Sequence, residues 1–409
     1  MATIFPSTLN GSVKAPPSKS CSHRALICAA LSDSPCTVKS LSGCDDVMLT
    51  KRCLEALGAE FDGETVIPID RAAPKSGVIL DCGDSGSTLR FLLPIVCALG
   101  VSAEFRLSTQ LAKRPIAPLC KVLCAHGASI QQCGNTIRTS GKITSGRYEL
   151  DGSISSQFIS GLLMALPLVG GGKVNIIPPI VSANYIDITI DYLRLSNIYV
   201  NQIDNTFSVS GDYRFPSRHT VEGDWSAAAF WLCAGAMGLG KIRVDGLSCG
   251  SSQGDRRILD ILRTMGFSAS DFGTLSPCGP CPSLVTVDVS DVPDLFPPLA
   301  VLAAAAAPET HFTGTSRLRF KESDRLRAVD VMLTSMGIRT ERSNDTFTVF
   351  GGKLYGAELS ASNDHRIAMT AIIAACAASS PSSLDDISCI SKSYPDFIHD
   401  FKSLGGQIL

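Results

Sequence analysis

A short pattern recurs at nearly constant intervals along the chain, and it constrains the fold more than any other feature. An apolar helical turn ends on a residue that tolerates a left-handed backbone and then runs into a strand-like stretch. This residue is Gly58, Gly127, Asn197, Gly266, Gly337 and Gly405 in turn, at spacings of 69, 70, 69, 71 and 68 residues. Glycine and asparagine are the residues that most readily adopt the left-handed conformation that ends many helices. The pattern therefore predicts six related units, each with one helix that ends in this way.

Units of about 70 residues are too large for solenoid repeats and too small to form a good core alone, so six of them favour two lobes of three. Apolar stretches with helical spacing, such as 155–166 and 330–337, alternate with short stretches that we interpret as strands, such as 185–190 and 346–351. This alternation predicts an α/β fold with mixed sheets and buried helices. The boundary between the lobes is expected near 220–237, where a strand gives way to a new helix.

The composition narrows the class of protein. A formal net charge of −2 argues against a nucleic-acid partner, so any bound anion must be met by a local group of cations. No apolar stretch approaches the length of a membrane span, and residues 1–11 lack the basic and apolar stretches of a signal peptide. We therefore expect a soluble, cytoplasmic protein that acts on small molecules, without nucleic acid or membrane as a partner. We also expect it to be a monomer.

The cysteines do not form a metal-binding pattern. Many of the 16 lie within apolar stretches, where they look like small buried hydrophobic residues. Cys278 and Cys281 form a Cys-x-x-Cys pair in a turn rich in Gly and Pro, but the pair has neither a second cysteine pair nor a paired histidine. We therefore expect no metal at this place.

Residues 16–27, PPSKSCSHRALI, bring Lys19, Arg24 and three serines to the start of an apolar helix. In one interpretation, Ser18 or Ser20 simply caps a helix whose first turn is exposed to water. In the other, the free N–H groups of the helix, the hydroxyls and the two cations converge on a phosphate. The segment alone favours neither interpretation.

Four further polar clusters precede apolar helices. In 81–95, Arg90 stands in a first helical turn, where a cation opposes the helix dipole, so it needs either a bound anion or a salt bridge to Asp81 or Asp84. This segment lacks the lysine of a nucleotide-binding P-loop, which argues against ATP. The other three clusters are Ser155–Ser156–Gln157, the charged stretch 317–327, and Asp364–His365–Arg366.

Each of these clusters taken alone can be a helix cap or a solvated helix start. Together with Asp291 and Asp294, which precede the apolar stretch 295–307, they favour one electropositive cleft at several helix N-termini. Such a cleft suits small ligands with phosphate and carboxylate groups. Asp294 and Glu322, which stand among or near these cations, are then candidates for proton transfer.

The chain resembles the 5-enolpyruvylshikimate-3-phosphate (EPSP) synthase family of enolpyruvyl transferases along its whole length. The motifs PSKSxSHRAL, GxSGSTLR, KRPI, SSQF, YIDIT, VEGD, KESDRL, NDHRIAM and YPDF occur in the order and spacing of that family. The resemblance implies an inverse α/β barrel fold, with six βαβαββ repeats, three in each lobe. It implies one lobe of residues 1–18 and 224–409, a second lobe of 19–223, and an active site in the cleft between them.

The resemblance also implies a reaction. Such enzymes transfer the carboxyvinyl group of phosphoenolpyruvate to the 5-hydroxyl of shikimate 3-phosphate and release phosphate, without a metal or other cofactor, on the shikimate pathway to chorismate. It assigns Asp294 as the base toward the 5-hydroxyl and Glu322 as the acid toward the methylene, with Lys19 and Lys392 assisting. The implied contacts to shikimate 3-phosphate are Lys19, Ser20, Arg24, Ser155, Ser156, Gln157, Ser182, Asp294 and Lys321. Those to phosphoenolpyruvate are Lys19, Gly86, Arg114, Gln157, Arg325, Arg366 and Lys392.

Three positions depart from the family pattern. Asp84 stands where an amide is common, Arg317 where many relatives carry an uncharged residue, and Trp225 where a small residue is usual. The alternatives are the related transferase that acts on UDP-N-acetylglucosamine, the RNA 3′-phosphate cyclases, and an anion-binding protein without catalysis. Ser20 with Arg24 argues against the first, the lack of basic character against the second, and Asp294 with Glu322 against the third.

Overall fold

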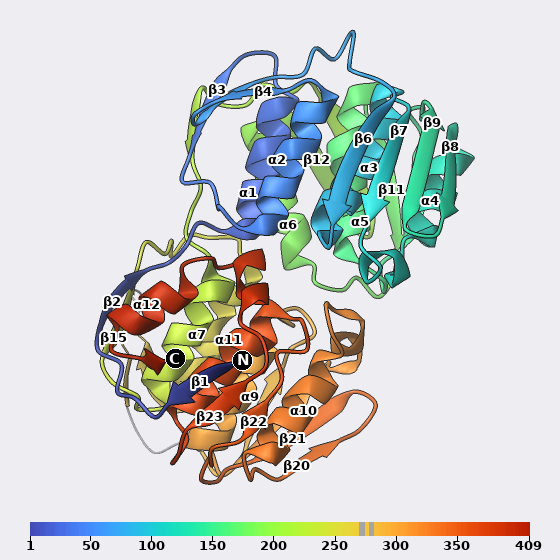
Figure 1. Ribbon diagram of the computed structural model, residues 1–409. Helices are drawn as coiled ribbons and strands as arrows, with labels where there is room; N and C mark the ends of the chain where they lie inside the picture. Colours follow the sequence, from blue (N-terminus) through green and yellow to red (C-terminus); the bar gives the residue numbers. More distant parts are fainter. Residues whose placement is uncertain (270–274, 278–281) are drawn as a thin grey trace. The chain divides into compact units, whose positions relative to one another are not determined.

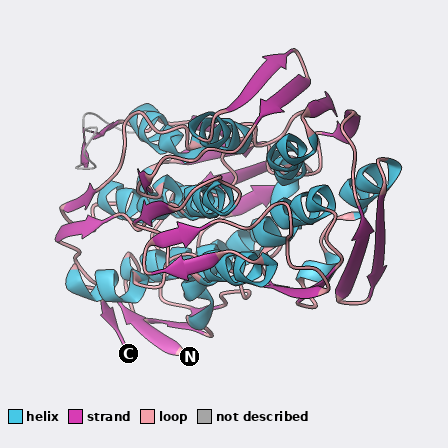
Figure 2. Ribbon diagram, turned by 90° about the horizontal axis from the view of Figure 1, so that it is seen from above, coloured by secondary structure: helices cyan, strands magenta, loops and turns pink. Residues whose placement is uncertain are grey.

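The computed structural model describes residues 1–269, 275–277 and 282–409, so the Cys278–Cys281 pair lies outside the described residues. The chain divides into two compact units (Figure 1). The central unit is Pro17–Val221, and the terminal unit combines Met1–Pro16 with Glu222–Leu409. Each unit has its own hydrophobic core, and each combines helices with strands (Figure 2), as expected for an α/β fold.

The central unit contains the same four-stranded sheet three times. In each sheet a parallel pair of strands is followed by two antiparallel neighbours, and helices connect the strands in the order βαβαββ. The second repeat consists of β6 (Val78–Gly83), α3 (Gly86–Leu99), β7 (Ala103–Leu107), α4 (Ala117–Ala125), β8 (Ala128–Cys133) and β9 (Thr136–Gly141). The third consists of β10 (Arg147–Asp151), α5 (Ser156–Ala165), β11 (Gly172–Ile177), α6 (Asn184–Leu195), β12 (Ile198–Ile203) and β13 (Thr206–Gly211).

The first repeat of the central unit takes its outer strand from the far end of the unit. It consists of α1 (Lys19–Ala30), β3 (Cys36–Lys39), α2 (Asp45–Leu57), β4 (Glu60–Asp62) and β5 (Thr65–Ile67), and β14 (Arg218–Thr220) pairs in parallel with β3. The sheets have the orders β14-β3-β5-β4, β6-β7-β9-β8 and β10-β11-β13-β12. Within the described residues these sheets stay separate, so their strands do not close into a barrel.

The terminal unit repeats the βαβαββ order with the chain ends interleaved. Two of its three repeats form the same four-stranded sheet, whereas the described strands of the first repeat form two two-stranded sheets. One repeat consists of β2 (Gly11–Lys14), α7 (Trp225–Ala236), β15 (Ile242–Asp245), α8 (Ile258–Thr264), β16 (Phe267–Ala269) and β17 (Leu275–Pro277). The next consists of β18 (Val285–Asp288), α9 (Phe296–Ala306), β19 (Glu309–Thr313), α10 (Arg325–Ser335), β20 (Thr340–Arg342) and β21 (Thr346–Phe350). The last consists of β22 (Glu358–Leu359), α11 (His365–Cys376), β23 (Ser382–Leu384), α12 (Phe397–Ser403), β24 (Gln407–Ile408) and the N-terminal strand β1 (Ala2–Phe5), which lies between β23 and β24.

The predicted left-handed residues are confirmed at all six places. Their φ angles are 114° at Gly58, 112° at Gly127, 62° at Asn197, 88° at Gly266, 88° at Gly337 and 103° at Gly405. Each follows the second helix of its repeat and turns the chain toward the next strand. A β-branched or bulky residue would be strained at these angles, which explains why glycine and asparagine recur there.

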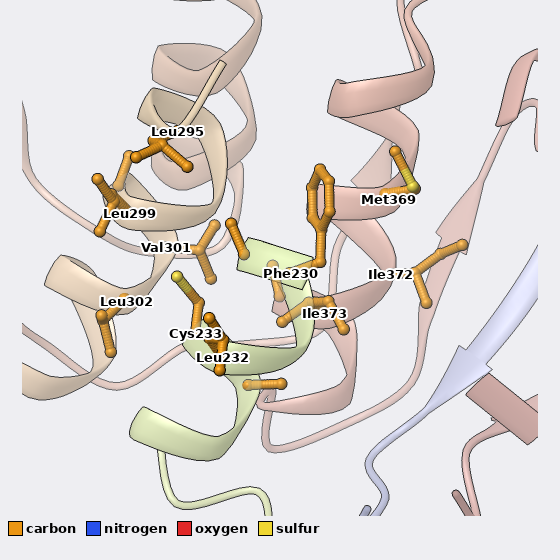
Figure 3. Close-up of a cluster of buried hydrophobic side chains, with 14 of the residues drawn as sticks. Phe230, Leu232, Cys233, Leu295, Leu299, Val301, Leu302, Met369, Ile372 and Ile373 are labelled. Atoms are coloured by element: carbon orange, nitrogen blue, oxygen red, sulfur yellow. The ribbon is translucent and has the colours of Figure 1, made fainter. Parts of the chain in front are cut away.

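One helix in each repeat is buried almost all round. In the terminal unit these helices are α7, α9 and α11, which contact one another through residues such as Phe230, Val301 and Ile373 (Figure 3). A helix that is apolar on every face belongs in a core. Among the described residues, no helix is both long and apolar enough to cross a membrane.

The interpretation of 185–190 as a strand was wrong, because these residues lie within α6. The alternating β-branched residues of this stretch resemble a strand over six positions. Over the longer segment, the buried residues Ile186, Thr189, Ile190 and Leu193 follow the i, i+3, i+4, i+7 spacing of a helix face.

Candidate active site

Lys19 begins α1 and forms an ion pair within the central unit. Its Nζ donates to Asp46 Oδ2 at 3.0 Å, and the two side chains are 15% and 6% exposed. Ser18 caps α1, since its side chain accepts a hydrogen bond from the N–H of Cys21. The interpretation of Ser18 as the cap of this helix is therefore confirmed. Lys19, however, stands beside the cap with its charge held in place by a carboxylate that the sequence analysis did not select.

Arg24 is buried, and it ties α1 to the start of α6. Its guanidinium donates to the carbonyls of Ser20 and Tyr185 at 2.7 and 2.8 Å, and its Nε donates to Thr189 Oγ1 at 2.8 Å. Burial lowers the pKa of Arg24 to about 10, so it remains a cation at neutral pH. Its position brings the segment of Ser20 close to that of Ser182, a buried residue with φ of 53° that precedes α6. Two serines selected from the sequence thus lie on segments joined by one cation.

Two guanidinium groups flank Gly86 at the first residue of α3. A Cβ atom at Gly86 would lie 2.9 Å from Nη1 of Arg114 and 3.5 Å from Nη1 of Arg90. Arg90 also donates to Gln157 Oε1 at 2.7 Å, and Gln157 Nε2 donates to Ser87 Oγ at 2.8 Å. Two cations and the N-terminal end of a helix thus meet at a residue without a side chain, an arrangement that favours a small anion.

Ser155 and Ser156 lie at the start of α5, and both are buried. Ser155 caps the helix, because its Oγ accepts a hydrogen bond from the N–H of Gln157 at 3.3 Å. Gln157 therefore links this helix start to Arg90 on α3. The three buried helices of the central unit, α1, α3 and α5, each begin with a serine cap followed by polar residues that the sequence analysis selected.

Arg325 organises the polar cluster of the terminal unit. Its guanidinium donates to Asp294 Oδ1 at 2.6 Å, to Glu322 Oε2 at 2.6 Å and to Asp364 Oδ2 at 2.8 Å. The side chain of Arg325 is 1% exposed, so these carboxylates compensate a buried charge. Asp364 also caps α11 through the N–H of Arg366. Asp364 was part of a polar cluster in the sequence, but nothing there indicated that it pairs with Arg325.

Asp294 lies between two arginines. Arg366 Nη2 contacts its second oxygen, Oδ2, at 2.8 Å, while Arg325 holds Oδ1. Although burial alone would raise it, the charges of Arg366, Arg325 and Lys321 hold the pKa of Asp294 well below its usual range. Asp294 is therefore ionised at neutral pH. Burial lowers the pKa of Lys321 to about 8, so its charge is the most easily lost in this cluster.

The remaining selected residues lie in both units. Lys392 is half-buried and ends a short 3-10 helix, Ser388–Lys392, in the terminal unit. Trp225, one of the three unusual positions, is a core residue whose indole N–H donates to the carbonyl of Ser248 at 3.2 Å. Asp84 accepts a hydrogen bond from Ser108, and Asp81 accepts one from the N–H of Gly83. Both carboxylates thus help to hold the loop that precedes α3.

Asp255 is a buried carboxyl group that the sequence analysis missed. It accepts a hydrogen bond from Ser226 Oγ in the first turn of α7, and its other oxygen has no partner among the described residues. Burial, and then the charge of Asp294, raise the pKa of Asp255 to about 7. Since its usual pKa lies near 4, the folded protein binds this proton more tightly than the unfolded chain does.

This raised pKa predicts a pH-dependent stability. Between about pH 4 and pH 7 the folded state holds a proton that the unfolded state has lost, so the free energy of unfolding should fall as the pH rises, by at most about 1.4 kcal/mol per pH unit. Asp255→Asn should remove this contribution, measured by urea unfolding at pH 5, 6, 7 and 8. The exposed Asp260→Asn is the control and should retain the slope. Equal slopes in both variants would contradict the prediction.

Comparisons with known proteins identify the family of this chain. The family model for EPSP synthase (3-phosphoshikimate 1-carboxyvinyltransferase) matches residues 5–401. A 3-phosphoshikimate 1-carboxyvinyltransferase of Clostridium acetobutylicum is 37% identical over 99% of this chain and 97% of its own length, and one of Clostridioides difficile is 36% identical over the same shares. An EPSP synthase structure from Acinetobacter baumannii matches with a TM-score of 0.81 and 24% identity, over 100% of this chain and 99% of that chain. The enolpyruvyl transferase NikO from Streptomyces tendae matches with a TM-score of 0.77 and 19% identity, over 100% and 98%. These two structures bear on the fold alone.

Proposed function

Because this chain belongs to the EPSP synthase family, we propose that it transfers the carboxyvinyl group of phosphoenolpyruvate to the 5-hydroxyl of shikimate 3-phosphate. The products are 5-enolpyruvylshikimate 3-phosphate and phosphate, on the route to chorismate. The observation that carries the proposal is the pairing of Asp294 and Glu322 with one buried cation, Arg325. This arrangement supplies two carboxylates for proton transfer beside cations suited to anionic substrates.

We assign the substrates by the chemistry of each cluster. In the central unit, the assigned ligands of shikimate 3-phosphate are Lys19, Ser20, Arg24, Ser155, Ser156, Gln157 and Ser182, and in the terminal unit they are Asp294 and Lys321. The assigned ligands of phosphoenolpyruvate are Lys19, Gly86, Arg114 and Gln157 in the central unit, and Arg325, Arg366 and Lys392 in the terminal unit. We propose that both sets of residues serve one pair of substrates. Arginine suits carboxylate and phosphate groups because its planar fork can donate two parallel hydrogen bonds.

The proposed reaction needs three proton transfers. The 5-hydroxyl loses a proton to Asp294 as its oxygen bonds to C2 of phosphoenolpyruvate, and the methylene carbon gains a proton from Glu322. The tetrahedral intermediate then loses phosphate and returns a methyl proton to the Glu322 carboxylate, which restores the carbon–carbon double bond. Fixed cations that face the phosphate as it leaves would stabilise the developing charge. Lys19 and Lys392 are assigned to this assisting role.

The direct test is phosphate release. Purified protein with shikimate 3-phosphate and phosphoenolpyruvate should release phosphate and form the enolpyruvyl product. UDP-N-acetylglucosamine in place of shikimate 3-phosphate, or an RNA 3′-phosphate end with ATP, should give none. Turnover with either of these, and none with shikimate 3-phosphate, would overturn the proposal. We further propose that the protein is a cytoplasmic monomer that needs no cofactor and binds no nucleic acid. The same assay in the presence of a chelator would test the need for a metal, and size-exclusion analysis would test the monomer.

Gly86→Ala should weaken phosphoenolpyruvate binding selectively. The added Cβ atom would lie 2.9 Å from Arg114 Nη1, so the guanidinium must move away from its place at the helix start. We expect KM for phosphoenolpyruvate to rise roughly tenfold, because a charge-assisted contact contributes about 1.5–3 kcal/mol. KM for shikimate 3-phosphate should change much less. Gly250→Ala is the matched control, since a Cβ there meets no atom within 4 Å. A wild-type KM in Gly86→Ala would remove Gly86 from the site.

A further inference from the structure

Four buried side chains of the central unit form a continuous hydrogen-bonded series that the proposed reaction does not use. His23 of α1 contacts Thr50 of α2 (Nδ1 to Oγ1, 2.8 Å), and Thr50 contacts Thr88 of α3 (Oγ1 to Oγ1, 2.7 Å). Thr88 Oγ1 in turn donates to Oγ of Ser85, the cap of α3, at 2.7 Å. All four residues are at most 1% exposed. We call this series the hydroxyl relay.

The direction of the relay follows from the donors available. Thr88 donates its hydroxyl hydrogen to Ser85, so its oxygen accepts a hydrogen bond from the hydroxyl of Thr50. Thr50 in turn accepts a hydrogen bond from the Nδ1–H of His23. The reverse order would leave a buried Nε2–H without an acceptor, because no described group forms a hydrogen bond with His23 Nε2. An unpaired buried N–H is rarer than an unpaired lone pair. Burial, with the charges of Lys19 and Arg24, holds the pKa of His23 well below its usual value, so the ring is neutral.

The relay lies between two groups assigned to the substrates, namely Lys19, which is assigned to both, and Gly86, which is assigned to phosphoenolpyruvate. The hydroxyls of Thr88 and Thr50 also donate to the carbonyl oxygen of Asp46, at 3.3 and 3.5 Å, so each shares its hydrogen between this carbonyl and its partner in the relay. The carboxylate of Asp46 holds Lys19 at 3.0 Å. At the other end, Ser85 directly precedes Gly86. Two hydroxyls thus connect the residue that holds Lys19 with the cap in front of Gly86.

We propose that Thr50 and Thr88 are positioning residues that hold Lys19 and the start of α3 in one fixed spacing, so that both anions can bind. The identity of the two anions, shikimate 3-phosphate and phosphoenolpyruvate, rests on the proposed function. The spacing itself does not. Thr88 is itself assigned to neither anion. Its hydroxyl is nevertheless the point where the connection to Lys19 and the connection to Gly86 join. Removing the hydroxyl should therefore weaken binding at both ends together.

The first experiment compares Thr88→Val and Thr50→Val with Thr88→Ser. Calorimetry measures the affinity for shikimate 3-phosphate and, separately, for inorganic phosphate as the probe of the Gly86 end. Each valine variant should lose about fivefold to tenfold in both affinities, as expected for one buried hydrogen bond. Thr88→Ser should restore both. Thr310→Val is the matched control, because Thr310 is fully buried and its hydroxyl has no partner among the described residues. Loss of only one affinity, or of neither, in folded variants would overturn the proposal.

The second experiment tests the relay in the unmodified protein, even if the valine variants do not fold. Nitrogen-15 spectra of histidine-labelled protein distinguish protonated from unprotonated ring nitrogens. His23 should show a protonated Nδ1 and an unprotonated Nε2, unchanged from pH 5.5 to pH 8. A protonated Nε2 would overturn the direction of the relay. This measurement needs no turnover, so it stays informative if shikimate 3-phosphate proves not to be the substrate.

Discussion

Asp294→Asn is expected to lower kcat by about 10²–10⁴-fold, because the amide cannot accept the proton of the 5-hydroxyl. The variant keeps the size of the side chain and one oxygen that can accept from Arg325 or Arg366. Binding of shikimate 3-phosphate should therefore stay near that of the wild type. Binding of phosphoenolpyruvate should be equal or tighter, since a negative charge beside Arg366 and Arg325 is removed. Steady-state kinetics and calorimetry together separate these effects.

The matched control for this prediction is Asp291→Asn, three residues upstream in the same segment. It should retain the wild-type kcat. If Asp294→Asn instead loses affinity for shikimate 3-phosphate and keeps its rate at saturation, Asp294 is a binding residue and another group is the base. The two arginines that hold Asp294 ionised also weaken it as a base. We therefore expect proton transfer to Asp294 only as the substrate oxygen attacks, rather than before.

Glu322→Gln is expected to lower kcat by a similar factor and to slow the exchange of solvent deuterium into the methylene of phosphoenolpyruvate. Glu322 accepts from Arg325 at 2.6 Å, and it is the assigned donor of the proton that the methylene gains. Glutamine keeps the contact to Arg325 but carries no proton that it can transfer. Mass spectrometry of recovered phosphoenolpyruvate measures the exchange.

The exposed Glu358→Gln is the control for this prediction, since it lies in the same unit on strand β22. It should exchange deuterium at the wild-type rate. Wild-type exchange in Glu322→Gln would show that another group protonates the methylene. Comparing Glu322→Gln with Asp294→Asn also separates the two proton transfers, because loss of the base should leave the exchange faster than loss of the acid does.

Much of the candidate site could be selected from sequence because its residues stand at the starts of buried helices. Ser18, Ser85 and Ser155 cap three such helices, and lysine, arginine or glutamine follows each within a few residues. Polar residues directly before an apolar helix are visible in a linear sequence. Their roles toward substrates came from the resemblance to a family and stay predictions.

The partners of these residues could not be selected, because they come from distant parts of the chain. Lys19 pairs with Asp46, 27 positions away, and Arg325 pairs with Asp294 and Asp364, 31 and 39 positions away. Asp46 also fits a first helical turn on its own, since a carboxylate there suits the helix dipole, so nothing in the sequence indicated a second role. Asp255 stands in a short polar segment that looks like an ordinary loop.

The sequence by itself determined the sixfold repeat and the α/β class, because only glycine and asparagine readily take the left-handed angle at six helix ends, and this chemistry is local. Tertiary structure alone decided three things. It made 185–190 a helix, since burial of Ile186, Thr189 and Ile190 on one face outweighed a local β pattern. It gathered three carboxylates around Arg325, because a buried guanidinium requires compensating charge. It also joined His23, Thr50, Thr88 and Ser85, because buried hydroxyl and imidazole groups must find partners wherever three helices meet.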